Sequence, residues 1–175
     1  MTTARQERKS RRSRAPSTAI LALLALAGGF GFVLTLALTP IGAATTELVV
    51  VNRYTGLAID GFDPVAYFVD DAPKVGRAEL EFRFQGATWR FQNEGNRAAF
   101  AASPDVYAPR FGGHDPLAVA RGAATPGHPA LWVVAEQRLY LFYSAEARAA
   151  FVRSPESAIE AAERNWPGVQ RTLAQ

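Results

Sequence analysis

Apolar residues follow three patterns along this chain of 175 residues. The first is an unbroken run, Ala19–Leu38, whose 20 residues are apolar apart from glycines and Thr35. A helix of that length spans the hydrocarbon core of a bilayer. The second pattern alternates apolar and polar positions, which predicts antiparallel strands paired as two β-hairpins. The strand segments are Glu79–Phe84, Thr88–Phe91, Leu131–Val134 and Arg138–Phe142.

The third pattern is helical periodicity, and it follows each predicted hairpin. Asn93 precedes a helix that we expect to end at Ala102, and Ser144 precedes one that we expect to end at Arg153. Both are good N-cap residues, and each helix is followed by a proline that stops it. A last amphipathic helix is predicted over Glu156–Asn165.

Shorter segments complete the predicted domain. Glu47–Val51 is expected to be a strand, and Val65–Val69 either a buried strand or a helical turn. Pro116–Gly122 is expected to form one or two helical turns closed by its glycine. These elements predict a small α+β domain with one transmembrane or signal helix before it.

The hairpin and its helix occur twice, 51 positions apart, as in the strings RAAF at 97–100 and 148–151. One hairpin with one helix cannot bury its apolar face alone, so we expect two such units to pack into a four-stranded α+β core. Strand and capping rules acting independently would also produce similar strings. The stretch Asp105–Pro116 has no counterpart after Pro155. We therefore expect whatever is particular to this protein to lie in that stretch.

Basic residues lie ahead of the long apolar run. Six of the 19 basic residues occupy the first 14 positions, and the positive-inside rule keeps them in the cytoplasm. The folded domain is then periplasmic, on a single-pass helix in the inner membrane. The alternative is a signal peptide cleaved before Thr45, which would release a soluble periplasmic domain. The predicted parts are a basic cytoplasmic region (1–17), a signal anchor or signal peptide (18–41), a linker with the first strand (45–56) and the folded domain (57–170).

Charge and composition exclude several function classes. Without the first 14 residues, which also hold Glu7, 13 basic and 15 acidic residues remain, so the domain lacks the excess of basic residues typical of nucleic-acid binding. The chain has no cysteine, which excludes disulfides and thiolate metal sites. It contains no phosphate loop and no nucleophile elbow, so we do not expect an enzyme. A weaker alternative is a hydrolase or isomerase that pairs His114 with Asp60 or Asp63.

Three strings occur together in a fixed order: GFDPVAYF at 61–68, the tract WRF to FGG at 89–113, and NWP at 165–167. Together they resemble the YHS-domain family over about residues 57–167. The resemblance implies a small, often exported α+β domain for which binding of copper or other heavy metals is proposed. Members commonly carry a cysteine shortly after the Gly-Gly pair, where this chain has Asp115. A hard carboxylate in place of a soft thiolate argues against copper(I) in particular.

His114 and Asp115 are the candidate metal ligands, because a histidine beside a carboxylate is a partial site for a divalent metal ion. Asp115 also fits an N-cap ahead of Pro116, and His114 fits a packed aromatic position. His128, between a glycine and a proline, is expected to be an exposed loop residue.

The remaining candidates would line a ligand pocket. Gly112 and Gly113 would let the backbone approach a ligand closely, and the tyrosines would offer hydroxyl groups. Asp63 precedes a proline and also fits a turn residue. These candidates are Asp63, Tyr67, Tyr107, Gly112 and Gly113. The sequence thus predicts an anchored module that binds a metal ion or small ligand. The alternative is a structural or protein-interaction module without a metal, and neither reading identifies a protein partner.

Overall fold

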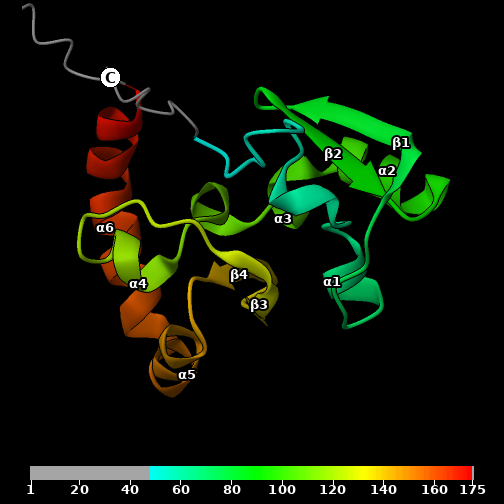
Figure 1. The fold of residues 1–175 in the computed structure, drawn as a ribbon. Coiled ribbons are helices and arrows are strands. Elements are labelled where there is room, and N and C mark those ends of the chain that lie inside the picture. The colour runs from blue at the N-terminus through cyan, green and yellow to red at the C-terminus, as the bar shows by residue number, and fades with distance from the viewer. Residues whose placement is uncertain (1–47, 175) are drawn as a thin grey trace, which may run out of the picture. The chain divides into compact units, whose positions relative to one another are not determined.

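The computed structural model describes residues 48–174, which belong to one compact unit (Figure 1). The predicted cytoplasmic region (1–17) and membrane helix (18–41) lie outside the described residues, as does Glu47. Among the helices of residues 48–174, none combines the length and apolar character that a membrane span requires.

Two antiparallel hairpins form, as the alternating pattern predicts. The first joins β1 (Arg77–Phe84) to β2 (Ala87–Phe91), and the second joins β3 (His128–Ala135) to β4 (Arg138–Phe142). Both turns place their two central residues at positive φ, which matches the twist of a hairpin. The four strands of the described structure form two separate two-stranded sheets, one for each hairpin.

Helices follow the hairpins at the predicted places. The Asn93 side chain accepts a hydrogen bond from the Asn96 backbone N–H at 2.8 Å, and Ser144 caps the later helix in the same way at 3.2 Å. The mixed α+β class is therefore confirmed. The α-helices are α1 (Ala66–Val69), α2 (Glu94–Ala102), α3 (Pro104–Tyr107), α4 (Pro116–Val119), α5 (Ala145–Arg153) and α6 (Pro155–Leu173). Two short 3₁₀ turns, η1 (Ile59–Gly61) and η2 (Arg110–Gly113), complete the set.

Two predicted boundaries are wrong. The segment up to Val51 does not form a strand within the described residues: Val51 makes one isolated bridge, to Ala58, and its neighbour Val50 donates to the carbonyl of Gly112 instead. Helix α6 continues past the predicted end at Asn165, with a proline inside it. Its apolar face continues to the buried Val169, so packing offsets the one backbone donor that a proline removes.

Each half of the domain has its own aromatic core. Phe100 of α2 is fully buried among four rings whose centroids lie 5.0–6.1 Å away: Phe82, Phe84, Trp89 and Phe91. Phe151 of α5 has the same role in the other half, 5.1 Å from Tyr140 and from Phe142. Helix α6 packs along α4 and covers this second core, whereas α3, which follows α2, has only four residues (Figure 1).

The predicted repeat is present and is longer than expected. Every strand pair of the first hairpin has its equivalent 51 positions later, including the bulge in the longer strand. The match also extends upstream, because Asp63 N–H donates to Lys74 O at 2.7 Å and Asp115 N–H donates to Thr125 O at 2.8 Å. We call residues 58–103 the first repeat and residues 110–154 the second repeat.

The stretch Asp105–Pro116 has no counterpart after Pro155, where α6 begins. Residues 110–116 do have a counterpart upstream, at 58–64. The strings GFDP (61–64) and GHDP (113–116) mark it in the sequence. They are 52 positions apart because the loop that leads to the second hairpin is one residue shorter.

Candidate functional site

The side chain of Asp63 links two elements of the first repeat through hydrogen bonds. Its side chain is fully buried, and Oδ1 accepts from the backbone N–H groups of Val65 at 2.8 Å and Ala66 at 3.4 Å. Oδ2 accepts from Gln92 N–H at 2.8 Å and from Asn96 Nδ2 at 2.7 Å. The carboxylate therefore joins the start of α1 to the end of the hairpin, and Asp63 lies away from any described cleft.

Asp115 makes the same connection in the second repeat. Oδ1 accepts from Leu117 N–H at 2.8 Å and Ala118 N–H at 3.2 Å, and Oδ2 accepts from Tyr143 N–H at 2.9 Å. The residue is only 2% exposed. The capping interpretation of Asp115 is confirmed, and both oxygens of this carboxylate accept from backbone N–H groups.

The glycine pair serves the fold of this chain. Gly112 and Gly113 have φ values of +61° and +88°, and with Phe111 at +55° they form a left-handed turn. A Cβ on Gly112 would lie 1.7 Å from the carbonyl oxygen of Leu48. The close approach that the pair permits is thus made by the chain's own backbone, and no ligand is needed to explain it.

Tyr67 and Tyr107 line neither of the two described clefts. The Tyr67 hydroxyl is buried and donates to the Pro129 carbonyl at 2.9 Å, while its ring lies edge-on to Trp132. This contact joins the two repeats. Tyr107 is half-buried, with its ring packed edge-on against Phe68.

Tyr67→Phe should change how stability depends on pH. Burial, and next the charge of Asp63, raise the pKa of Tyr67 above its ordinary value of 10.0. The unfolded chain therefore ionises first, and this contribution to stability is complete below pH 10 and declines as pH rises. The decline has a limiting slope of about 1.4 kcal/mol per pH unit, and the variant should lack it.

Urea unfolding of wild type and variant between neutral pH and pH 11 tests this expectation. At neutral pH the variant should lose about 1–2 kcal/mol, because the Pro129 carbonyl loses its donor. Burial also raises the pKa of Tyr140, which is present in both proteins and so cancels in the comparison. Equal alkaline slopes would contradict the role assigned to Tyr67.

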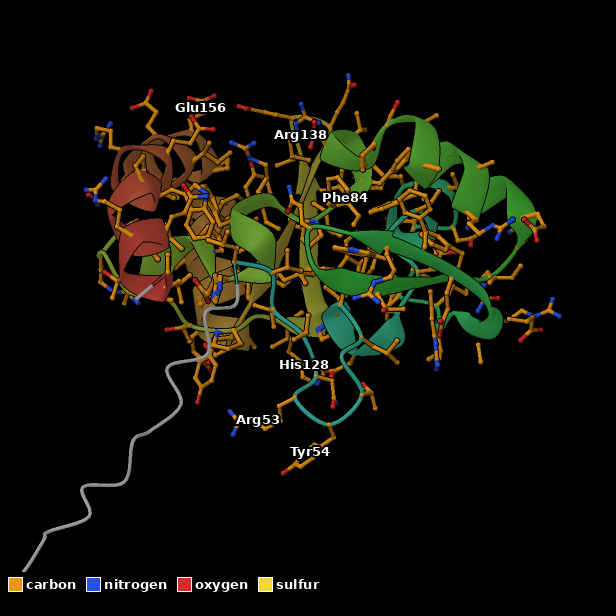
Figure 2. All side chains as sticks on the ribbon, turned by 90° about the horizontal axis from the view of Figure 1, so that it is seen from above. Arg53, Tyr54, Phe84, His128, Arg138 and Glu156 are labelled. Carbon is orange, nitrogen blue, oxygen red and sulfur yellow. The ribbon has the colours of Figure 1, made fainter. Side chains whose placement is uncertain are left out.

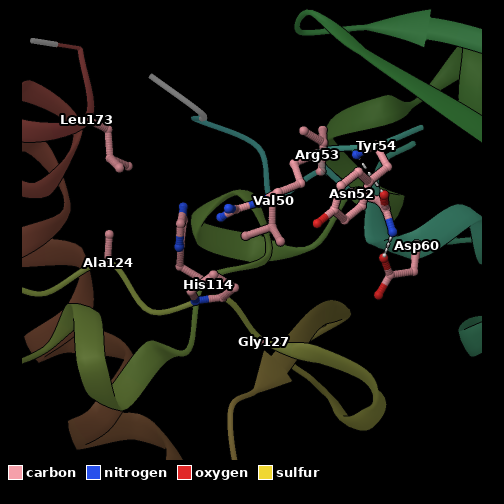
Figure 3. A pocket seen from close by; sticks show the side chains of 11 residues that line it. Val50, Asn52, Arg53, Tyr54, Asp60, His114, Ala124, Gly127 and Leu173 are labelled. Carbon is pink, nitrogen blue, oxygen red and sulfur yellow. Dashed lines mark hydrogen bonds between the residues drawn. The ribbon is translucent and has the colours of Figure 1, made fainter. Parts of the chain in front are cut away.

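His114 lies in a cleft of about 520 Å³ beside the second repeat (Figure 3). The residue is 4% exposed, and its ring centroid is 6.0 Å from that of Trp166. The cleft runs between the turn at Asn52–Tyr54 and the loop that leads to β3, with the end of α6 nearby. Its lining residues are Val50, Val51, Asn52, Arg53, Tyr54, Asp60, His114, Ala124, Pro126, Gly127 and Leu173.

Charged groups of both signs line this cleft. Asn52 Nδ2 donates to Asp60 Oδ1 at 3.1 Å, and Asn52 Oδ1 accepts from the backbone N–H of Tyr54 at 3.0 Å. Arg53 makes no ion pair or hydrogen bond with any residue of the described range 48–174. Figure 3 shows Asp60 well separated from His114 across the cleft, so the two do not form an acid–base pair there. Asp63 is engaged elsewhere, and the hydrolase hypothesis has no support in this geometry.

Metal ligands do not gather around His114 in the described structure. No group of three or more histidine, aspartate or glutamate residues within 48–174 could hold a metal ion. His128 opens β3 at the surface, and its Nδ1 accepts from the Ala130 N–H (Figure 2). The paired assignment of His114 and Asp115 to a metal ion stays a prediction without a third ligand.

A second cleft, of about 620 Å³, lies between the two repeats and is lined by Arg110, Arg138 and Trp166 among others. Both guanidinium groups are engaged there. Arg110 pairs with Glu163 at 2.7 Å, and Arg138 donates to the Asp105 carbonyl at 3.0 Å. This cleft offers fewer unsatisfied groups to a ligand than the cleft around His114.

No family model, curated protein or solved structure matches the chain. The resemblance to the YHS-domain family therefore rests on the sequence motifs and stays a prediction. Sequence reasoning identified His114 and considered Asp60, but it missed Arg53. A single arginine in a polar turn carries no distinguishing signal, because its importance depends on what the fold places opposite it.

Proposed function

We propose that this chain is a membrane-anchored, extracytoplasmic YHS-like module that binds a small molecule, without catalysis, in the cleft around His114. The anchor is the apolar run within residues 18–41, with the basic residues 1–17 on the cytoplasmic side. The folded domain then presents its cleft to the periplasm.

The observation that carries this proposal is a difference between the two repeats. His114 and Phe62 occupy equivalent positions, with φ and ψ of −75° and 148° against −73° and 151°. Each also makes an isolated bridge to the loop ahead of its own hairpin. The first repeat forms with a phenyl ring at this position, so the backbone of the repeat accepts either aromatic side chain. The imidazole thus gives the cleft beside the second repeat a polar ring that the first repeat lacks at the equivalent position.

Two further features favour a small molecule over a metal ion. The cleft volume of about 520 Å³ falls in the range of roughly 300–1,000 Å³ typical of small-molecule sites. The Asp115 carboxylate already accepts three backbone N–H groups, so its hydrogen bonds are explained by capping without a metal ion.

His114→Phe is the matched test, because the first repeat demonstrates that a phenyl ring suits this backbone. We expect the variant to fold, with its free energy of unfolding lowered by no more than about 1.5 kcal/mol. The melting temperatures of the full-length wild type and variant are compared in detergent. The compounds are small carboxylates, amines, amino acids, phosphates and sugars, and Cu(II), Zn(II), Ni(II) and Fe(II) form a separate arm.

At least one organic compound should raise the melting temperature of the wild type and leave that of the variant unchanged. Equal shifts in both proteins, or no shift with any organic compound, would overturn the proposal. Stabilisation by a metal ion that the variant loses would replace it with a metal-binding function.

A further inference from the structure

We propose, on the basis of the function above, that the ligand of this cleft is a small zwitterion. Its carboxylate lies against Arg53 and its ammonium group against Asp60. The inference rests on the charges, the free hydrogen-bonding capacity and the placement of these two side chains.

The Asp60 side chain is held in position and can still accept hydrogen bonds. It lies in the left-handed turn η1 at φ +54°, between Ile59 at +44° and Gly61 at +78°. Non-glycine residues rarely adopt this conformation, and Asn52 Nδ2 further restrains the side chain through Oδ1. No other hydrogen bond or ion pair of this carboxylate occurs with residues 48–174. Oδ2 is therefore available to a cationic group.

Arg53 supplies the opposite charge from the adjoining turn. That turn is fixed by Asn52, whose Oδ1 accepts from the N–H groups of Tyr54 and Thr55. Figure 3 shows the Arg53 side chain directed toward the His114 side of the cleft, while Asp60 lies beyond Asn52 on the other side. Asn52 thus fixes the turn that carries Arg53, restrains the Asp60 side chain and lies between the two. The two charged groups then face a ligand from different ends instead of pairing with each other.

Part of the cleft wall is apolar. Val50, Val51, Pro126 and Leu173 contribute apolar side chains to it. A guanidinium group binds a carboxylate through two parallel hydrogen bonds, and a carboxylate accepts from an ammonium group. A molecule with only one of these charged groups would leave the other protein charge without a counter-ion.

A homologous series of ω-amino acids tests the inference and measures the separation of the two charges. Glycine, 4-aminobutyrate and 6-aminohexanoate are titrated calorimetrically into the full-length protein, beside hexanoate and hexylamine, which each carry one charge. We expect one amino acid of the series to bind at least tenfold more tightly than either compound with a single charge.

Two charge-removing variants test which residue binds the carboxylate of the amino acid and which binds its ammonium group. Arg53→Gln should lower the affinity for the best amino acid about tenfold and leave hexylamine binding unchanged. Asp60→Asn keeps the oxygen that Asn52 binds, and it should lower amino-acid affinity similarly while leaving hexanoate binding unchanged. Arg121→Gln and Asp70→Asn change exposed residues outside the cleft and should have no effect.

The outcomes separate this inference from the proposed function. Hexanoate or hexylamine binding as tightly as every amino acid would overturn the zwitterion, as would amino-acid binding that survives both charge-removing variants. If no amino acid binds but another compound stabilises the wild type and not His114→Phe, the zwitterion fails and the small-molecule function stands. If no amino acid binds and no other compound stabilises the wild type, both the zwitterion inference and the small-molecule function fail.

Discussion

Asp63→Ala should be among the most damaging single substitutions in the described part of this protein, lowering the free energy of unfolding by about 3–5 kcal/mol. The change leaves four hydrogen-bond donors without their acceptor inside a fully buried site. Each buried donor left without a partner costs about 1–3 kcal/mol, and water entering the cavity recovers part of the loss. We expect a folded population too small to survive moderate warming.

Two control variants distinguish the loss of the Asp63 hydrogen bonds from a general effect of losing a charge. Asp63→Asn keeps Oδ1 for α1 but presents an amide donor to the Gln92 N–H, so an intermediate loss of about 1–3 kcal/mol is expected. Asp70→Ala removes a carboxylate that is exposed and should stay within about 0.5 kcal/mol of wild type. Thermal unfolding followed by near-ultraviolet circular dichroism ranks the three proteins. An Asp63→Ala protein as stable as Asp70→Ala would show that the hydrogen bonds of Asp63 contribute little to the free energy of unfolding.

The parts of this fold that sequence predicts are those decided by local rules. Alternation placed both hairpins, and Asn93 and Ser144 marked the helix starts, because caps and strand periodicity depend on neighbouring residues alone. The end of α6 was missed because Pro167 is a local stop signal, whereas burial of Val169 by distant residues decides the outcome.

The candidate site was predicted only in part, for a related reason. His114 and Asp115 stood out as chemical types, but the partners that decide their roles lie far along the chain. Tyr143 is 28 positions from Asp115, and the turn that carries Arg53 lies near the N-terminal end of the described residues. One signal in the sequence could have distinguished the structural residue, Asp115, from the candidate ligand-binding residue, His114. It is the pair of strings GFDP and GHDP. Aligning them shows that the aspartate is shared by both repeats and that the histidine is not.

Gly112→Ala should release the segment at residues 48–51 from the domain and cost about 3 kcal/mol or more. The new Cβ would overlap the carbonyl oxygen of Leu48 at 1.7 Å, and that atom is backbone, so no side-chain rotation can relieve the contact. The hydrogen bond from Val50 N–H to Gly112 O, at 2.7 Å, would break as the segment moves. The positive φ of +61° adds strain of its own.

Gly86→Ala is the matched control, because Gly86 has φ +79° and nothing lies within 4 Å of a Cβ there. It should show the cost of positive φ alone, about 1 kcal/mol, in the turn of the first hairpin. Urea unfolding gives the two losses, and limited proteolysis locates the change: new cleavage near Arg53 is expected in Gly112→Ala and not in Gly86→Ala. Val50, Asn52 and Arg53 also line the cleft, so Gly112→Ala should lose amino-acid binding that Gly86→Ala keeps. Equal losses of stability with unchanged proteolysis would mean that the 48–51 segment does not depend on the glycine. The cleft would then have to be held together by other contacts.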